Sequence, residues 1–149
     1  MKRNEVQQGT VSKRIPFETG YLSLPLEPLE NVHLLGTKCG DCKAIVFGSW
    51  LRCENCSSSN VEVIKLGKKG KIWSYSFVHY PPPPPFKPDN PFVALPVAWV
   101  ELPEGLRILS YLDCVPKNLK IGMDVKLVLE DAWVDENGNQ AVMYKFKQV

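Results

Sequence analysis

The sequence predicts a mainly β protein of three parts: an N-terminal arm over residues 1–32, a metal-binding ribbon over 33–60 and a closed β-barrel over 61–149. Three observations support this prediction. Four cysteines form two Cys-x-x-Cys pairs, short strand-like segments recur after residue 61, and no segment has helical periodicity long enough to predict a helix. With 149 residues, the chain has the length of one domain or of two small modules packed together.

The arm is interrupted by prolines, and its apolar residues lack helical spacing. They gather in Ile15–Phe17 and Leu22–Leu29. Because prolines and turn residues break both segments, extended stretches and short turns are expected. Two interpretations stay open: the arm docks on the surface of a partner, or it packs on its own domain.

The four cysteines predict a structural zinc site of the rubredoxin-like ribbon type. Two residues separate the cysteines within each pair and ten separate the pairs, and this spacing lets two tight turns deliver four thiolates in a tetrahedron. Four protein ligands leave no open position for water or substrate, so the zinc is expected to stabilise the fold and not to catalyse. The predicted ligands are Cys39, Cys42, Cys53 and Cys56.

Between the cysteine pairs, a short hairpin is expected. Ala44–Phe47 and Trp50–Leu51 are strand-like and flank Gly48-Ser49. A module of this size cannot bury enough apolar area to fold alone, so the metal should supply much of its folding free energy.

The remainder of the chain predicts about five strands that close into a small barrel. Glycine and Asp/Asn turns separate most of the segments, and a small closed barrel is the usual solution for strands at this spacing. Trp73 and Trp99 are interpreted as core or barrel-wall residues. The strand-like segments are Val61–Leu66, Ile72–Val78, Val93–Leu102, Leu106–Leu112, Val125–Leu129 and Ala141–Phe146.

A run of five prolines, Pro81–Pro85, interrupts the barrel pattern. It predicts a stiff polyproline II rod of about 15 Å, which has no amide donors to join a sheet and should project from the barrel rim. The rod is either a rigid connection between two strands or a pre-ordered arm that docks on a partner with little loss of entropy.

Composition and charge exclude several classes of protein. The net charge of +2 is divided evenly between residues 1–60 and 61–149, which disfavours a general nucleic-acid binder. No apolar run reaches the ~18–20 residues of a membrane span, and the polar N-terminal stretch is not a secretory signal. Cysteines in a chain without such a signal indicate metal ligands in a reducing compartment, so a cytoplasmic location is expected.

No set of catalytic residues is predicted in this chain. Cys114 ends a strand-like segment with no histidine nearby in sequence, which is typical of a small buried apolar residue. The carboxylate pairs Glu130-Asp131 and Asp135-Glu136 resemble a solvated turn. No phosphate-binding or metalloprotease motif occurs.

Taken in chain order, these motifs resemble a known family. The four-cysteine ribbon is followed by Gly70–His79, by the proline loop ending at Pro91-Phe92, by Val97–Arg107 and by Leu119–Val125. Over about residues 33–131, this order is similar to the zinc-ribbon/OB-fold family of acyl-CoA-associated proteins, which are accessory subunits of thiolases. The resemblance implies that the barrel is a five-stranded OB-fold.

The resemblance also implies a function, ligands and a partner. The chain would be a non-catalytic subunit that helps a thiolase-like catalytic subunit bind a CoA thioester and cleave a β-keto acyl-CoA, in a complex of two plus two chains. Within the family, the chain is most similar to the small subunits of benzoylsuccinyl-CoA thiolase from anaerobic toluene degradation. Residues near the barrel rim would contact acyl-CoA or the partner: Lys68, Lys69, Lys71, His79, Phe86 and Arg107.

The chain departs from the family in two places. Many relatives begin with a helix bearing a Phe-Trp pair, whereas this chain has the proline-broken arm. Lys43 and Ser57 also follow the cysteine pairs where glycine is frequent, which should weaken the expected amide-to-sulfur geometry.

Two alternative functions differ in class. A nucleic-acid-binding ribbon/OB module would stack bases on Trp73, Tyr75 and Phe77. A rubredoxin-like electron carrier would bind iron, but its cysteine pairs are much farther apart than those of this chain.

Overall fold

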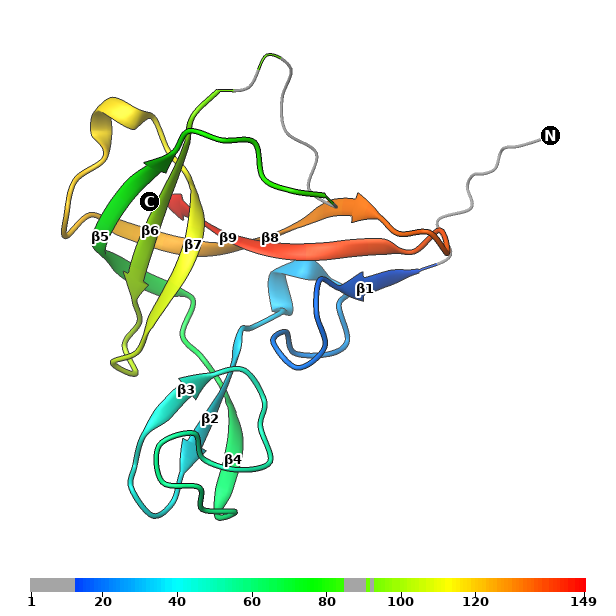
Figure 1. The fold of residues 1–149 in the computed structure, drawn as a ribbon, viewed down its shortest axis with the longest axis vertical. Helices are drawn as coiled ribbons and strands as arrows, with labels where there is room; N and C mark the ends of the chain where they lie inside the picture. Colours follow the sequence, from blue (N-terminus) through cyan, green and yellow to red (C-terminus); the bar gives the residue numbers. More distant parts are fainter. Residues whose placement is uncertain (1–12, 85–90, 92) are drawn as a thin grey trace.

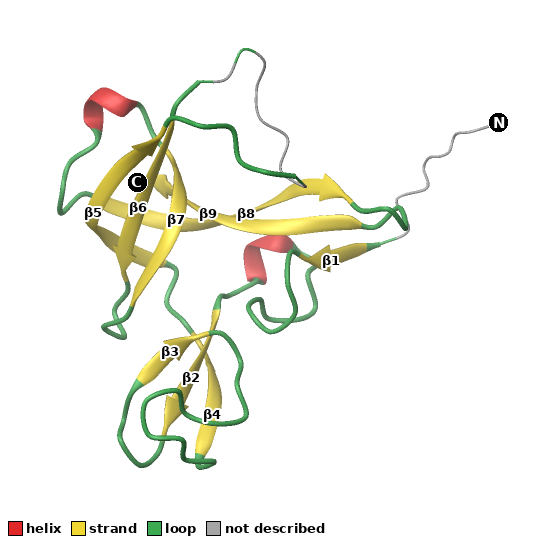
Figure 2. Cartoon of the chain, in the orientation of Figure 1, coloured by secondary structure: helices red, strands yellow, loops and turns green. Residues whose placement is uncertain are grey.

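The chain forms a β-barrel, a long hairpin that extends from it, and a smaller sheet beside it (Figure 1). The computed structural model describes residues 13–84, 91 and 93–149; the predicted site residue Phe86, the last of the five prolines and the first 12 residues of the arm lie outside them. Figure 2 shows strands and loops with two short 3-10 helices, η1 (Leu29–Asn31) and η2 (Pro116–Asn118). Among the described residues, no helix has the length and apolar composition needed to cross a membrane.

Five strands close the barrel and confirm the predicted five-stranded architecture. Antiparallel pairing links β5 with β6 and β8, β6 with β7, and β8 with β9, while parallel pairing of β7 with β9 closes the ring. This strand order is that of an OB-fold. The strands are β5 (Lys69–Val78), β6 (Leu95–Glu101), β7 (Arg107–Asp113), β8 (Asp124–Val134) and β9 (Gln140–Gln148).

Alternation along each strand directs one set of side chains into the barrel. On β6 and β7 the even-numbered residues are buried, as Val100 and Ile108 show with exposures of 0% and 1%. Trp73 and Trp99 are not in the core: they are 49% and 43% exposed and lie on the outside of the barrel wall. Other buried side chains of the barrel are Ile72, Ala98, Leu112, Val125, Leu127, Val142, Tyr144 and Phe146.

The ribbon is a three-stranded antiparallel sheet in the order β3-β2-β4, with β2 at Leu35–Cys39, β3 at Ile45–Phe47 and β4 at Val61–Lys65. The predicted hairpin within the ribbon is wrong in its partner, because β3 pairs with β2, while Trp50–Leu51 is not part of a strand.

The sequence predicts the segment of β4 as a barrel strand, but β4 pairs along its whole length with β2 in the ribbon. An alternating pattern marks a strand without specifying which sheet it joins. The domain boundaries themselves stay a prediction.

The described part of the arm packs on its own chain. Strand β1 (Arg14–Pro16) pairs in parallel with β9, and the Arg14 guanidinium bonds both carboxylate oxygens of Asp131 at 3.0 and 3.1 Å. Apolar side chains at the end of the arm and the start of the ribbon belong to the same buried cluster as the barrel core: Leu22, Leu26, Val32 and Leu34.

The chain passes between barrel and ribbon twice, and the two connections are bonded to each other. The amide of Leu66 donates to the carbonyl of Leu34 at 2.8 Å, and His33 Nδ1 lies 3.1 Å from the carbonyl of Leu66. An aromatic cluster then joins all three parts, with ring centroids 4.8 to 6.3 Å apart. Its members are Phe17 and Tyr21 of the arm, Phe47 and Trp50 of the ribbon, and Tyr144 of the barrel.

Candidate metal centre and ligand-contact residues

The four cysteines of the ribbon converge on one point. Their Sγ atoms all lie within 4.8 Å of one another; those of Cys39 and Cys56 are 3.6 Å apart, and those of Cys42 and Cys53 are 3.5 Å apart. Each cysteine pair, with the two residues between its cysteines, forms a tight turn called a knuckle. The first knuckle, Cys39–Cys42, begins at the end of β2, and the second, Cys53–Cys56, lies in the loop before β4. The sheet therefore fixes the position of both. Four convergent sulfur donors fit the tetrahedral preference of Zn²⁺.

Backbone amides point at the sulfur atoms in both knuckles. Asp41 and Cys42 donate to Cys39 Sγ, each at 3.4 Å. In the second knuckle, Asn55 and Cys56 donate to Cys53 Sγ at 3.3 and 3.4 Å. These bonds stabilise thiolates and orient them before a metal binds.

Lys43 and Ser57 keep this geometry although they replace glycine. Their φ angles are 69° and 66°, in the left-handed region that glycine enters most easily. The next amides, of Ala44 and Ser58, act to lower the pKa of the Cys42 and Cys56 thiols. The predicted weakening of the amide-to-sulfur contacts stays a prediction, and the left-handed backbone of the two residues carries a conformational cost.

The thiols of Cys42 and Cys56 differ in their pKa. The Asn55 side chain, 3.5 Å from Cys42 Sγ, and the Ala44 amide lower the pKa of Cys42 to about 6. The Ser58 amide also lowers the pKa of Cys56, but the neighbouring thiol of Cys39 and burial outweigh it and raise that pKa to about 12. Four thiolates so close together repel one another, and a divalent cation would remove that repulsion.

A hydrogen-bonded carboxylate joins the two knuckles beside the cluster. Asp41 accepts from the Ser58 hydroxyl and from Asn60 Nδ2, the latter at 3.1 Å. These bonds, the one from Ser58 first, lower the pKa of Asp41. The loops that carry the cysteines are therefore linked without the metal.

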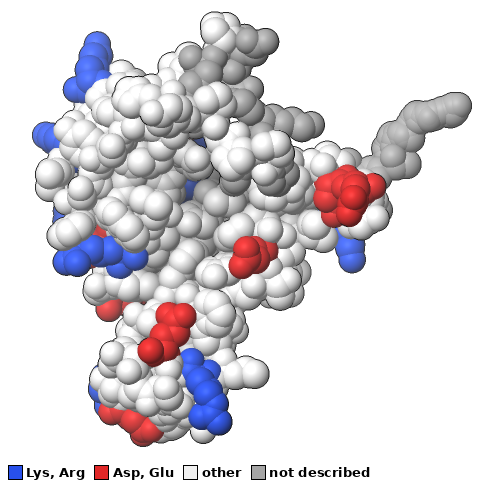
Figure 3. Space-filling view, viewed as in Figure 1, with Lys and Arg blue, Asp and Glu red and all other residues white. Residues whose placement is uncertain are grey.

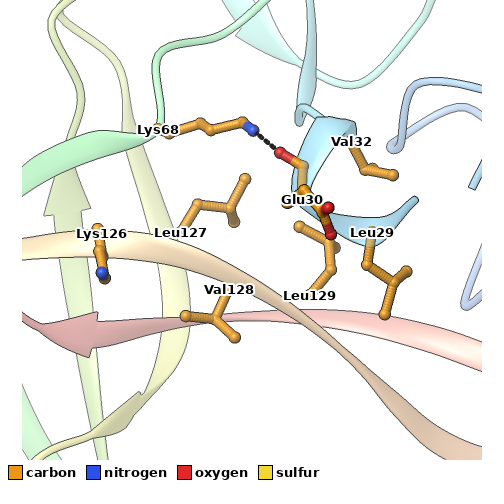
Figure 4. A pocket seen from close by; sticks show the side chains of 8 residues that line it. All are labelled: Leu29, Glu30, Val32, Lys68, Lys126, Leu127, Val128 and Leu129. Atoms are coloured by element: carbon orange, nitrogen blue, oxygen red, sulfur yellow. Dashed lines mark hydrogen bonds between the residues drawn. The ribbon is translucent and has the colours of Figure 1, made fainter. Parts of the chain in front are cut away.

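Lys68 lies in a cavity of about 350 Å³ between the arm and the barrel (Figure 4). Its ammonium group donates to the carbonyl of Glu30, and Lys126 lies at the rim. The remaining lining is mostly apolar, which suits a ligand with an apolar part and a negative charge. The cavity is lined by Leu29, Glu30, Val32, Lys68, Lys126, Leu127, Val128 and Leu129.

Lys69 and Lys71 line a second, smaller cavity of about 220 Å³ at the start of β5. The Lys71 ammonium lies 2.6 Å from the carboxylate of Asp124, and the Arg107 guanidinium lies 3.5 Å from that of Glu101. Both ion pairs are exposed to solvent, so they leave these cations available to an anionic ligand at small cost.

The structure does not gather all the predicted contact residues at one site. His79 follows the end of β5, whereas Lys69 begins that ten-residue strand, so they lie at opposite ends of it, with an extended length of at most about 33 Å between them at ~3.3 Å per residue. The three lysines line two cavities, and Phe86 lies outside the described residues. Their roles in binding stay predictions.

No nucleophile with an activating base occurs among the described side chains that line these cavities. Cys114 is half-buried, and burial, together with the charge of Asp113, raises the pKa of its thiol. It therefore stays protonated at neutral pH, as expected of an inert cysteine.

Comparison with known proteins gives related chains of similar length. The family profile of the ChsH2 C-terminal OB-fold domain matches residues 63–130. A DUF35 domain-containing scaffold protein of Methanocaldococcus jannaschii is 37% identical over 80% of this chain and 84% of its own. The benzoylsuccinyl-CoA thiolase subunit BbsA of Geobacter metallireducens is 26% identical over 100% of this chain and 99% of its own.

One solved structure has a similar fold. A chain of the Ltp2-ChsH2(DUF35) aldolase superposes with a TM-score of 0.59 and 28% sequence identity. The match covers 78% of this chain and 84% of the other.

Proposed function

Because this chain belongs to the DUF35 family, we propose that it is a non-catalytic accessory subunit of a thiolase- or aldolase-type complex. The observation that carries the proposal is the full-length similarity to a thiolase subunit in a chain whose described cavities bring together no nucleophile and base. The partner would supply the nucleophilic cysteine and the groups that move protons.

The subunit would help to form the acyl-CoA site of the complex. Thiolysis of a β-keto acyl-CoA requires a channel that holds the thioester and keeps its phosphates bound at the surface. Lys68, Lys69 and Lys71 present ammonium groups within a few residues of one another, and such groups bind phosphates. Benzoylsuccinyl-CoA is the proposed substrate, supported by the two BbsA relatives.

Zinc would stabilise the ribbon and take no part in the reaction. Cys39, Cys42, Cys53 and Cys56 would hold it, and four sulfur ligands leave no position for a water molecule or a thioester carbonyl. One zinc per chain and a colourless protein are expected. A red protein with iron in place of zinc would instead indicate the electron carrier.

Co-expression with the thiolase-type chain of the same gene cluster tests the proposal. The purified complex should cleave a β-keto acyl-CoA when CoA is added, and the thiolase-type chain alone should be at least tenfold less active. Thiolysis at the full rate by that chain alone would contradict an essential accessory role.

A further inference from the structure

The outside of the barrel has two contrasting sides. On β8 and β9, the outward residues include Lys126, Glu130, Lys145 and Lys147. The Lys145 ammonium lies 2.9 Å from the carboxylate of Glu130 and 3.8 Å from that of Asp113. A charged and paired surface of this kind is typical of the solvated face of an antiparallel sheet.

The outward side chains in the central part of β6 and β7 are instead apolar. Trp99 lies opposite Leu109 and Val97 lies opposite Tyr111. Trp99 is 43% exposed and Leu109 51%, and both lie beside strands whose inward side chains already form the core. Strands that are apolar on both faces are typical of sheets covered on both sides.

Trp73 of β5 extends this surface to a third strand. Its ring is 49% exposed, and the Arg107 guanidinium stacks over it at 4.1 Å from the ring centroid. The Glu101 carboxylate, 3.5 Å from Arg107, compensates the positive charge. In Figure 3 the surface over β5, β6 and β7 is accordingly almost free of charged side chains, with those present at its margin. Tryptophan and arginine are the residues that contribute most binding energy at protein interfaces.

The strand pairing restricts what can cover this surface. Strand β6 is hydrogen-bonded to β5 on one side and to β7 on the other, so it offers no free backbone edge to an extended peptide. Strands β6 and β7 are strands 2 and 3 of the OB-fold, and their outer face is the one on which such barrels often bind nucleic acid. At its centre, however, this face has aromatic and aliphatic side chains and no cation among the described residues, so it cannot bind a phosphate backbone tightly. The occupant must therefore present a folded, uncharged and apolar surface.

We propose that the β6–β7 face, defined by Trp73, Val97, Trp99, Leu109 and Tyr111, is the surface on which the catalytic thiolase-type subunit docks. This inference rests on the proposed function, which supplies the partner.

The test introduces a charge at the centre of the face. Leu109→Lys places an ammonium group beside Trp99 at a position that is already half exposed, so the barrel should still fold. Binding to the co-expressed thiolase-type chain, measured by light scattering after gel filtration and by calorimetry, should weaken at least 30-fold. Trp99→Gln is a second variant, with an expected loss of at least tenfold.

Ile121→Lys is the matched control, because Ile121 is 67% exposed on the same barrel but lies in the loop before β8. It should change the affinity less than threefold. Equal effects of Leu109→Lys and Ile121→Lys, or no effect of Leu109→Lys and Trp99→Gln in folded protein, would overturn the inference and leave the proposed function intact.

Three other results also overturn it. If the chain alone forms a dimer that Leu109→Lys dissociates, the face joins two copies. If the chain binds a single-stranded oligonucleotide, and Leu109→Lys removes that binding, the occupant is nucleic acid. If the unaltered chain binds no thiolase-type protein, the proposed function fails as well.

Discussion

The ribbon and the barrel are stabilised in different ways, although they are built from similar short strands. Each barrel strand contributes side chains to a buried apolar core. In the ribbon, the large apolar residues Ile45, Phe47 and Ile64 are only half-buried and pack against the core cluster of the remainder of the chain. The ribbon therefore relies on its four cysteines and on packing against the barrel and the arm. The barrel, in contrast, has its own core and further apolar side chains on its outer wall.

The largest expected effect tests whether the ribbon depends on its cysteines while the barrel does not. Cys53→Ser removes a buried ligand, and structural zinc contributes about 10–16 kcal/mol in zinc-finger peptides. The variant should lose its zinc, and amide hydrogen exchange should rise across β2, β3 and β4 while the barrel stays protected. Metal analysis and exchange mass spectrometry measure the two effects.

Cys114→Ser is the control for that experiment, since Cys114 lies outside the cluster. It should retain one zinc per chain. If Cys53→Ser also retains its zinc, the assignment of the metal ligands is wrong.

The reverse experiment weakens the barrel and leaves the cysteines untouched. Phe146 is fully buried near the C-terminal end of β9, and Phe146→Ala should lower the free energy of unfolding by about 3–5 kcal/mol. Urea unfolding followed by tryptophan fluorescence measures the loss. A loss below about 1 kcal/mol would show that the barrel core contributes less than its burial indicates.

High pH should weaken the contact between the two regions. Burial raises the pKa of Tyr144 to about 12, so the folded protein keeps its phenol protonated where the unfolded chain ionises near 10. The stability that this group contributes is complete below about pH 10 and falls, by up to about 3 kcal/mol, as the pH rises to about 12.

Tyr144→Phe should remove that part of the pH dependence. At neutral pH it should cost about 1 kcal/mol, because the hydroxyl donates to the carbonyl of Leu109 at 2.8 Å. Urea unfolding at pH 8 and at pH 11 compares the two proteins. Parallel pH profiles would contradict the role of Tyr144.

The smallest effect concerns the polar interior of the ribbon. The Thr37 hydroxyl donates to the carbonyl of Gly48 at 2.7 Å and accepts from the amide of Trp50 at 3.0 Å. Thr37→Val leaves both groups without this partner and should destabilise the ribbon by about 1–2 kcal/mol, seen as faster amide exchange there. Thr37→Ser keeps the hydroxyl and should be milder; equal effects would mean that the methyl group matters more.

The features that the sequence predicts well are local. Two Cys-x-x-Cys pairs imply convergent sulfur atoms because each knuckle is a tight turn, and the strand segments of the barrel follow from alternation and turn residues. The four-cysteine cluster and the closed barrel could both be predicted for this reason.

The features that the sequence does not predict depend on tertiary pairing. Strand β4 pairs with β2, and the paired residues Leu35 and Lys65 are thirty positions apart in the sequence. Nothing within Val61–Lys65 specifies that pairing. The distance between Lys69 and His79 follows from β5 being one continuous strand. Trp99 and Val100 are both apolar residues of the same apolar run. Only the pleat of the strand places Trp99 outside the barrel and Val100 inside it.

The paired connections at Leu34 and Leu66 limit how the ribbon can move. A module on one flexible linker can rotate freely, but this ribbon is held by two chain segments that are bonded to each other where they pass. Rotating the ribbon relative to the barrel would have to break that bond and separate the aromatic rings that join the two regions. A partner bound to the barrel would therefore meet the four-cysteine loops over a narrow range of orientations.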